Sequence, residues 1–378
     1  MSRLNSGAII LSAAGRASAQ EQLVDRALRA NTLALAKQLR AVGVEHVVVA
    51  GPDLDWLCGE RGITLDRDSM PFHFGRRLAG LIARYGMAPV FYFGAGSGPL
   101  LPADALADAL ARLLAGEASG ARRVVTNNLH SCDWLGLSRP KDALPVIQAA
   151  QRDNGLAWSL QEEGGYSIEI APGPDTPAQL DLDTPADLAL ARVHPACPPA
   201  LRTALDDPML DRIPVGDLAN VLAEDGSRVA LVGRVAPPAW QALSRATRCW
   251  IRVYSEERGM AASERLARGE VRSLIATLLR MLGPDRFFAE LGMMADAAII
   301  DSRVLMAASG AYPPAADRFA SDLLLPEWID DPWLRDFTRA AANAGYPVLL
   351  GGHGVVSGGL YALVDRVQSQ RQANHDPQ

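Results

Sequence analysis

The stretch Ala8-Ile-Ile-Leu-Ser-Ala-Ala-Gly-Arg16, near the start of the chain, decides the fold. It opens with a fully apolar run, which is typical of a strand buried on both faces of a parallel sheet. The small residues that follow predict a tight turn into a helix. The next segment fits that helix, because Leu28, Leu35, Leu39 and Val42 recur at helical spacings.

A strand followed by a helix then recurs along the first half of the chain. Gly43 ends the first helix and Glu45–Ala50 returns as a strand, which predicts a strand–helix–strand unit with a right-handed crossover. The further elements expected here are helices over Phe74–Tyr85 and Ala103–Leu114, strands at Pro89–Phe93 and Arg123–Thr126, a hairpin over Ala157–Ile170, and a helix from Asp183 to about Val193 with Thr184 as its N-cap.

The proline-dense segment His194–Pro199 predicts a domain boundary near residue 198. The elements expected beyond it are strands at Arg228–Val232, Trp250–Tyr254, Ala297–Ile300 and Pro347–Leu350, and helices over Ala262–Leu282, Asp285–Leu291, Pro332–Ala344 and Gly358–Gln370. We therefore expect an α/β protein. A mostly parallel sheet with helices on both faces would occupy residues 1–198, a second, smaller α/β domain residues 199–370, and a disordered tail residues 371–378.

Composition narrows the classes of function. The 378 residues include 37 Lys and Arg against 43 Asp and Glu, and this acidic balance disfavours a nucleic-acid binder. No apolar stretch is long enough for a transmembrane helix, and the apolar run near the N-terminus is too short for a signal peptide. The 4 cysteines are scattered, which favours neither a disulfide framework nor a zinc site. We expect a cytoplasmic protein with no nucleic-acid or membrane partner.

Two segments of the first half can carry chemistry. Backbone N–H groups near Ala14 and Gly15 can approach a phosphate, and Arg16 would add a fixed charge. A tight turn that merely needs small residues is the alternative. The second segment, Thr126-Asn-Asn-Leu-His-Ser-Cys-Asp-Trp134, follows a predicted strand and would lie at the carboxyl end of the sheet, where ligands of α/β proteins bind.

The polar side chains of this second segment also have a structural interpretation. Asn128 suits a turn and His130 suits an exposed cap, while Asn127 and Asp133 offer a donor and an acceptor to a ligand. Cys132 is a conceivable nucleophile, although a lone cysteine is more often a packing residue. The sequence leaves both interpretations of the segment open.

Three parts of the first half resemble the MobA/CofC-like nucleotidyltransferases of the GT-A superfamily. Leu11–Arg16 is similar to the family's Leu-Ala-Ala-Gly-type loop. Phe74–Ala79, Val90–Gly94 and Gly98–Pro102 follow the family's order of a helix, a strand and a Gly-Asp-x-Pro turn. Asp181-Leu-Asp-Thr-Pro-Ala-Asp-Leu188 resembles its closing Asp-x-Asp-Thr-Pro-x-Asp-Leu element.

The resemblance implies a GT-A or Rossmann-like domain that binds a nucleotide or a nucleotide-linked small molecule, with Mg²⁺ as cofactor. The site residues expected on this basis, together with the polar segment, are Asp183, His130 and Asp133 for catalysis, Ala14, Gly15, Arg16, Ser97, Asn127 and Asn128 for the nucleotide, and Asp181 and Asp183 for the metal. For the two aspartates the alternative is a solvated Asp181 and an Asp183 that only begins the helix.

The departures from the family pattern concern its charged groups. The family loop continues with an Arg, a Gly and a Lys that bind triphosphate, whereas this chain continues Ala17-Ser-Ala-Gln-Glu-Gln22. The family's metal-binding Asp aligns with Ser97. Because phosphoryl transfer depends on cations held by carboxylates, these replacements argue against ordinary catalysis by the family mechanism.

The second half carries one conspicuous motif, Gly351-Gly-His-Gly-Val-Val-Ser-Gly-Gly359, between a predicted strand and a helix. Its glycines suit close approach to an anion or, alternatively, a packing turn. The candidate residues of this half are Glu256, Asp301, His353 and Ser357, each near the end of a predicted strand. Charged turn residues are usually solvated, and only their expected convergence at one sheet edge makes them candidates.

The leading hypothesis is a nucleotidyltransferase-like protein that binds a nucleotide or a nucleotide-linked small molecule, with Mg²⁺-dependent transfer if the site is active. The alternative is a catalytically degenerate GT-A scaffold for oligomerisation or partner binding, with any chemistry in the C-terminal domain. A homo-oligomer is compatible with either hypothesis. The leading hypothesis requires the distant motifs of the first half to meet at one end of a sheet and form an anion pocket.

Overall fold

The computed structural model describes residues 5–13, 15, 17–68, 71–173, 176–310 and 312–375. The chain divides into two compact units, the first comprising Met1–Arg16 and Leu28–Pro174 and the second Ala17–Ala27 and Asp175–Gln378. Residues 176–198 thus group with the second unit, whereas the sequence predicts a division near residue 198. The reason is that helix α6 (Pro185–Val193) is buried over most of its length and packs on helix α15 (Gly358–His375).

The first unit is built on a seven-stranded sheet with the order β3-β2-β1-β4-β6-β5-β7. The strands are β1 Gly7–Leu11, β2 His46–Gly51, β3 Ile63–Arg67, β4 Val90–Gly94, β5 Arg123–Thr126, β6 Trp134–Leu137 and β7 Ser167–Ile170. Only β6 runs antiparallel to its neighbours among these described strands. β1 lies in the middle of the parallel part, where Ile9 is aligned with Val48 of β2 and Tyr92 of β4.

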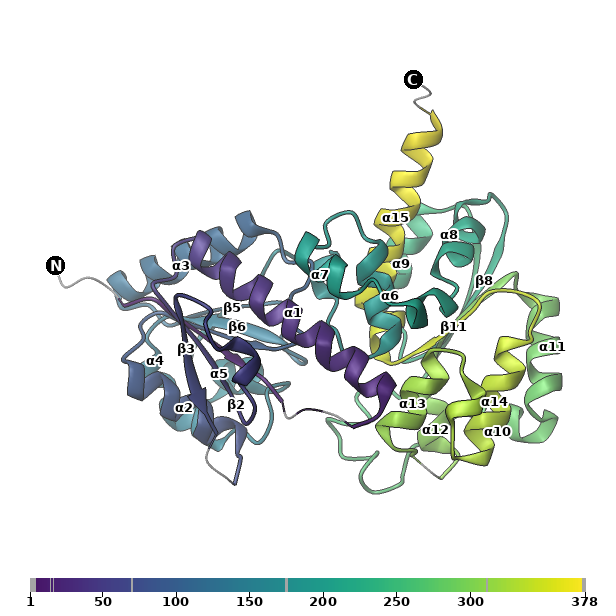
Figure 1. Cartoon of the computed structure of the whole chain (residues 1–378), viewed down its shortest axis with the longest axis horizontal. Coiled ribbons are helices and arrows are strands. Elements are labelled where there is room, and N and C mark those ends of the chain that lie inside the picture. Colours follow the sequence, from purple (N-terminus) through teal and green to yellow (C-terminus); the bar gives the residue numbers. More distant parts are fainter. Residues whose placement is uncertain are drawn as a thin grey trace. The chain divides into compact units, whose positions relative to one another are not determined.

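Helices cover both faces of this sheet (Figure 1). They are α1 Ala19–Ala41, α2 Phe74–Tyr85, α3 Ala103–Ser119, α4 Pro140–Ala149 and α5 Leu156–Glu162, with a short 3-10 turn at Asp55–Leu57. Helices α2, α4 and α5 share a core with the strands on one face, and α1 and α3 lie on the other. The first turns of α1 are grouped with the second unit and the remainder with the first.

The second unit contains a four-stranded parallel sheet with the order β11-β10-β8-β9. The strands are β8 Arg228–Gly233, β9 Trp250–Ser255, β10 Ala297–Asp301 and β11 Val348–Gly351. The helices are α6 and α15 with the bounds given above, α7 Pro199–Ala204, α8 Val215–Ala223, α9 Pro237–Ala246, α10 Leu274–Leu282, α11 Pro284–Met294, α12 Ser302–Ala308, α13 Ala315–Asp322 and α14 Pro332–Ala342. Helices α8, α9 and α15 pack together on one face, and α10, α11 and α14 on the other (Figure 1).

The prediction of an α/β protein with a mostly parallel first sheet and a second α/β part is confirmed. Thr184 is the N-cap of α6 as predicted, because its side chain accepts the N–H of Asp187 while the Asp187 carboxylate accepts the N–H of Thr184. The second unit, however, is the longer of the two rather than the smaller. No described helix is both long and apolar enough to cross a bilayer.

Three expected elements differ. The expected hairpin over 157–170 is helix α5 followed by β7, which pairs in parallel with β5. The expected helix from Ala262 starts only at Leu274, because left-handed backbone at Glu264 and Gly269 interrupts it. Helix α15 continues to His375, and Arg371 donates hydrogen bonds to the carbonyls of Ala246 and Ala223, so the expected disordered tail is helical up to residue 375.

A glycine on α2 fixes how closely that helix approaches the next. The Gly75 N–H donates to the Ala150 carbonyl, and a Cβ on Gly75 would lie 2.0 Å from the Ile147 carbonyl oxygen.

We predict that Gly75→Ala lowers the unfolding free energy by about 2 kcal/mol, because the helices must separate. On the same helix, a Cβ at Gly80 would meet nothing within 4 Å. Gly80→Ala should therefore stabilise by up to about 1 kcal/mol in urea titrations, and equal effects of the two substitutions would contradict the packing argument.

Candidate functional site

The carboxyl edge of the seven-stranded sheet gathers two of the predicted segments. Strands β4 and β5 end at this edge, and β6 begins there because it runs in the opposite direction. The Gly94 N–H at the end of β4 donates to the Asp133 carbonyl over 3.3 Å, and the Thr126 hydroxyl at the end of β5 donates to the Trp134 carbonyl over 2.7 Å. The loops after β4 and β5 therefore lie side by side.

Ser97 is directed into the protein at this edge. Its side chain is buried, and its Oγ donates to the Asp133 carbonyl over 2.6 Å. The loop is held from α1, where Asn31 Nδ2 donates to the carbonyls of Ala95 (2.9 Å) and Ser97 (3.0 Å). Ser97 aligns with the metal-binding carboxylate of the resembling family. Its hydroxyl is instead used in a hydrogen bond to the neighbouring loop.

Asn127 and Asp133 form a reciprocal pair. Asn127 is buried, its Nδ2 donates to Asp133 Oδ2 over 2.7 Å, and its Oδ1 accepts the Asp133 N–H over 3.2 Å. Asp133 is half-buried. The amide holds the carboxylate in one orientation at the carboxyl edge, which is what a ligand-contacting acceptor requires.

The other candidates of this segment have mainly structural partners. Asn128 Oδ1 accepts the N–H groups of His130 and Ser131 and so closes the turn, and the side chain of His130 is exposed. Cys132 is buried with its Sγ 2.9 Å from the Asp153 carbonyl oxygen, and burial raises the pKa of its thiol to about 12. Cys132 is therefore a protonated packing residue rather than a nucleophile.

Arg29 is a cation at this edge that the sequence analysis did not single out. Gly15 is exposed, and the Arg29 Nη2 atom lies 3.8 Å from where a Gly15 Cβ would stand. Arg29 also pairs with Asp53, 3.2 Å away in the loop after β2, and its guanidinium lies over the Trp56 ring, 5.5 Å from the centroid. Ala14 and Arg16 lie outside the described residues. No motif marks Arg29, because it is brought to Gly15 by helix α1 rather than by adjacency in sequence.

The second unit has its own cluster at the carboxyl ends of β8 and β10. The buried Asp301 accepts hydrogen bonds from Arg234 Nε (2.6 Å) and Nη2 (3.1 Å). Gly233 permits this contact, because it has a φ of 111° and a Cβ there would lie 2.5 Å from the Asp301 Cβ. Burial opposes ionisation of Asp301, but the charge and hydrogen bonds of Arg234 outweigh it and hold the pKa of this carboxyl below its usual range.

His353 follows β11 and interacts electrostatically with both members of this pair. Burial, together with the positive charge of Arg234, lowers the pKa of His353 to about 4, although Asp301 acts in the opposite direction. The imidazole is consequently neutral at physiological pH and only partly covered. Arg234, Asp301 and His353 thus form one polar group on adjacent strand ends. Arg234 follows a strand as directly as Asp301 does, so the same sequence signal could have found it.

The remaining candidates of the second unit are bonded elsewhere. Glu256 caps α10, where Oε1 accepts the Ser273 hydroxyl and Oε2 accepts the Leu274 N–H over 3.0 Å. Ser357 donates to the His353 carbonyl over 2.8 Å and closes a 3-10 turn. These contacts account for both side chains as structural groups.

The aspartates expected to hold the metal lie in the second unit, with Asp183 exposed and Asp181 half-buried. Within the described part of the chain, no three His, Cys, Asp or Glu side chains are arranged to hold a metal ion. A shared pocket of Arg16 and Asp183 stays a prediction.

Asp187, four residues after Asp183, is fully buried in the first turn of α6. Its Oδ2 accepts the Thr184 N–H (2.9 Å) and hydroxyl (2.7 Å), whereas its buried Oδ1 has no hydrogen-bond partner among the described residues. Gly354 leaves room for Oδ1, since a Cβ there would lie 2.1 Å from it. Burial, reinforced by the negative charges of Asp183 and Asp322, raises the pKa of Asp187 to about 8.

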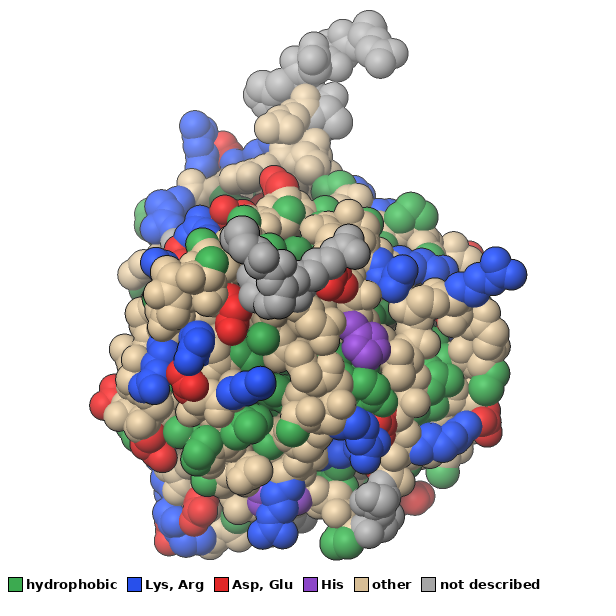
Figure 2. Space-filling view, turned by 90° about the vertical axis from the view of Figure 1, so that its left-hand side faces the viewer, with side chains coloured by type: hydrophobic (Ala, Val, Ile, Leu, Met, Phe, Trp, Pro, Cys, Tyr) green, Lys and Arg blue, Asp and Glu red, His purple; other side chains and the backbone are tan. Residues whose placement is uncertain are grey.

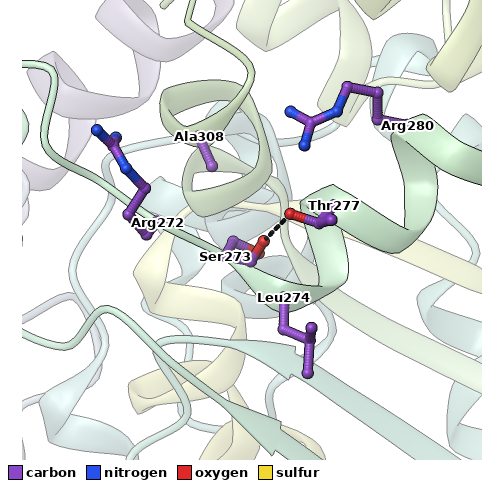
Figure 3. Close-up of a pocket in the computed structure, with 6 residues that line it drawn as sticks. All are labelled: Arg272, Ser273, Leu274, Thr277, Arg280 and Ala308. Atoms are coloured by element: carbon purple, nitrogen blue, oxygen red, sulfur yellow. Dashed lines mark hydrogen bonds between the residues drawn. The ribbon is translucent and has the colours of Figure 1, made fainter.

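A surface pocket of about 520 Å³ adjoins α10 and is lined by Arg272, Ser273, Leu274, Thr277, Arg280 and Ala308. Arg272 and Arg280 project toward the side of Ala308, whereas Leu274 projects away from it (Figure 3). The Glu256 carboxylate already occupies the N-terminus of α10. A second anion there would meet that carboxylate, so we do not assign this pocket as the functional site.

The charges visible on one face of the molecule are mixed. On the face in Figure 2, Lys and Arg side chains are interspersed with Asp and Glu among the described residues, and no broad area has one sign of charge. This distribution is typical of a globular surface rather than of an electrostatic footprint for a polyanion.

Comparison with known proteins gives distant structural likenesses. No family model and no curated protein matches the chain. The N-terminal half is similar to a cytidylyltransferase from Leptospira borgpetersenii, with 12% identity, a TM-score of 0.39, and coverage of 50% of this chain and 86% of that chain. A protein assigned as a nucleotide-diphospho-sugar transferase from Desulfovibrio desulfuricans gives 10% identity, a TM-score of 0.35 and the same coverage, 50% and 86%.

A third match spans the whole chain. A dipicolinate synthase component from Bacillus halodurans covers 99% of this chain and 99% of its own, with 12% identity and a TM-score of 0.26. At identities and TM-scores this low, function has to be argued from the residues of the chain itself.

The raised pKa of Asp187 predicts a specific pH dependence of stability. Between about pH 4 and pH 8 the unfolded chain has ionised this carboxyl while the folded chain keeps its proton. Rising pH therefore favours unfolding in this window, by up to about 1.4 kcal/mol per pH unit, and the loss levels off above pH 8. Asp187→Asn mimics the protonated form and should reduce this slope in urea titrations across the window. Parallel stability curves for the two proteins would contradict the assignment.

Proposed function

We propose that the first unit binds an anionic nucleotide or nucleotide-linked small molecule at the carboxyl edge of its seven-stranded sheet. The observation that carries this proposal is the position of the Arg29 guanidinium beside Gly15, at the end of the central strand β1. Crevices at the carboxyl ends of parallel strands are where α/β proteins bind such ligands. The guanidinium supplies a permanent positive charge with several donors for phosphate oxygens.

The Asn127–Asp133 pair adds the second half of the site. Asp133 is an oriented acceptor on the same edge and suits the hydroxyl or amino groups of a ligand. The resemblance of Leu11–Arg16 to the phosphate loop of the MobA/CofC-like nucleotidyltransferases supports the same ligand class. In this arrangement Arg29 would take over the charge that the missing Arg and Lys of the family loop provide.

Mg²⁺, which the resemblance implies, does not fit the residues around Ser97. The hydroxyl at this position is uncharged and donates to the Asp133 carbonyl, so it does not replace a carboxylate ligand. Our proposal therefore concerns binding of the nucleotide and routes no step through a metal. The proposal keeps the ligand site of the resembling family. It omits nucleotidyl transfer, because the charged groups of the family loop and the metal-binding carboxylate are missing.

Isothermal titration of the full chain with nucleoside triphosphates and nucleotide sugars, with and without Mg²⁺, tests the proposal. We expect binding that Arg29→Gln weakens at least tenfold, because one charge-assisted contact of about 1.5–3 kcal/mol is lost. Arg40→Gln is the matched control, since Arg40 lies on the same helix and donates to the Gly62 carbonyl instead. No binding at millimolar ligand, or equal affinities for both variants, would refute the proposal.

A second candidate function is acid–base chemistry on a small anion in the second unit. It is favoured by the Arg234–Asp301–His353 group, which lies where the strand order of the parallel sheet reverses between β8 and β10. The guanidinium of Arg234 can bind the anion, whose negative charge would offset the positive charge that lowers the pKa of His353 and so favour proton transfer to the imidazole from water or a hydroxyl group.

Hydrolysis of a generic phosphoester such as p-nitrophenyl phosphate by the full chain tests this candidate. We expect activity that His353→Gln abolishes and that Arg29→Gln leaves unchanged, because the two residues belong to different units of the chain. The opposite pattern would assign the chemistry to the first unit, and absence of hydrolysis in the wild type would reject the second candidate.

A further inference from the structure

Strand β9 forms one edge of the four-stranded sheet, and no described strand pairs with its outer side. It is the last strand in the order and pairs with β8 on one side. All residues of β9 are half-buried or exposed, whereas β11 at the other edge is entirely buried. An accessible edge strand presents unpaired N–H and C=O groups that can pair with another strand.

The hydrogen bonds to β8 show which backbone groups of β9 face outward. The Trp250 N–H donates to the Ser227 carbonyl over 2.7 Å, and the Glu256 N–H donates to the Gly233 carbonyl over 3.0 Å. Because the direction alternates along a strand, the even-numbered residues bond to β8. The N–H and C=O groups of Ile251, Val253 and Ser255 consequently point to the open side.

Exposed apolar side chains lie at both ends of one face of β9. Trp250 is 71% exposed at the start of the strand. Glu256 lies on the same face, because side chains alternate with a period of two, and its carboxylate binds the Leu274 N–H. Leu274, which is 78% exposed, therefore stands beside the far end of that face.

We propose that a second copy of this chain pairs with β9 in antiparallel orientation, about a two-fold axis at Val253. Val253 would then lie opposite Val253 of the second copy, and Ile251 opposite Ser255, each pair exchanging two backbone hydrogen bonds. The two four-stranded sheets become one continuous sheet. This inference is independent of the proposed nucleotide site, which lies in the other unit.

The side chains of β9 are complementary to themselves in this register. Arg252 lies opposite Tyr254 of the second copy, which suits a cation–π contact. Trp250 lies opposite Glu256 of the second copy and reaches the adjacent Leu274, so the exposed apolar groups at the two ends of the strand cover each other. A two-fold interface requires such self-complementarity, which a strand of an unrelated partner would match only by coincidence.

Neighbouring registers are less favourable for a second copy. A two-fold axis at position 252 would place the guanidinium of Arg252 against its own copy, and like charges directly opposite are destabilising. An axis at position 254 would extend the pairing to Glu257, whose φ of 59° ends the extended backbone. The register about Val253 avoids both the like-charge contact at Arg252 and the break in extended backbone at Glu257.

Light scattering of the full chain after size exclusion tests the association. We expect a dimer with twice the 40.3 kDa mass of the chain. Val253→Pro should yield a folded monomer, because the N–H that proline removes faces away from β8. Leu274→Ser should raise the dimer dissociation constant at least tenfold. Met281→Ser is the matched control, since Met281 is 77% exposed on the same helix but lies about two turns after Leu274 and so farther from the end of β9.

Oxidative cross-linking of cysteine variants of the full chain tests the register. Val253→Cys should form a disulfide-linked dimer, because hydrogen-bonded pairs have Cα atoms about 5.5 Å apart. Ile251→Cys should not exceed the wild-type background, since its partner is Ser255. The combination Ile251→Cys with Ser255→Cys should cross-link.

Several outcomes would overturn the proposal. A wild-type monomer at tens of micromolar, or a dimer that survives Val253→Pro with unchanged affinity, would exclude pairing through β9. Equal loss of association in Leu274→Ser and Met281→Ser would place the contact on the surface of α10 instead. Cross-linking of Ile251→Cys to itself would exclude the register about Val253.

Discussion

The parallel pairing of β1 with β2 and β4 is the constraint on which the first unit depends. It places Ile9 between Val48 and Tyr92 in a region buried on both faces, and it brings the loops after these strands to one edge. A register shift of one residue would exchange the faces to which the side chains point. The loop that contains Gly15 and the loop after β4 keep their places only because this register is fixed.

Buried charge is handled differently at the two sheet edges. Asp301 is compensated by Arg234, and Arg303 forms a fully buried two-point ion pair with Asp322 at 2.7 and 2.6 Å. In the first unit the charged groups at the edge, Arg29 and Asp133, are partly accessible to solvent. A fully buried ion pair orders the structure around it, whereas an accessible charge can still exchange its partner for a ligand.

Apolar periodicity predicted the long helices and the central strands, because their burial follows from local patterns. Apolar periodicity did not predict the short strands β3 and β6. β6 is Trp134-Leu-Gly-Leu137, and its Gly136 is required by the neighbours Phe91 and Leu113, which a Cβ would approach to 2.6 and 2.5 Å. Gly269 is a residue type that commonly ends a helix, whereas left-handed backbone at Glu264 could not be recognised from the sequence, because a glutamate rarely adopts it.

The site residues that could be predicted are those marked by the sequence around them, and the others are brought into place by distant parts of the fold. Asp133 and Asp301 could be named from the sequence because the polar segment of Asp133 follows the predicted strand at Arg123–Thr126, and Asp301 lies at the end of another predicted strand. Arg29 could not, because its approach to Gly15 depends on the path of α1. The sequence predicted that Thr184 and Asp187 begin a helix. It did not predict the burial of Asp187, because the Asp187 side chain packs against Gly354, which lies far along the chain.

The buried carboxyl of Asp187 couples folding to the uptake of a proton. When the chain refolds near neutral pH, this carboxyl takes up a proton from the buffer, since burial at the start of α6 raises its pKa to about 8. The heat of refolding then includes the ionisation enthalpy of whichever buffer supplies the proton. Two solutions of equal pH, one buffered by phosphate and the other by an amine, will thus record different enthalpies for the same conformational change.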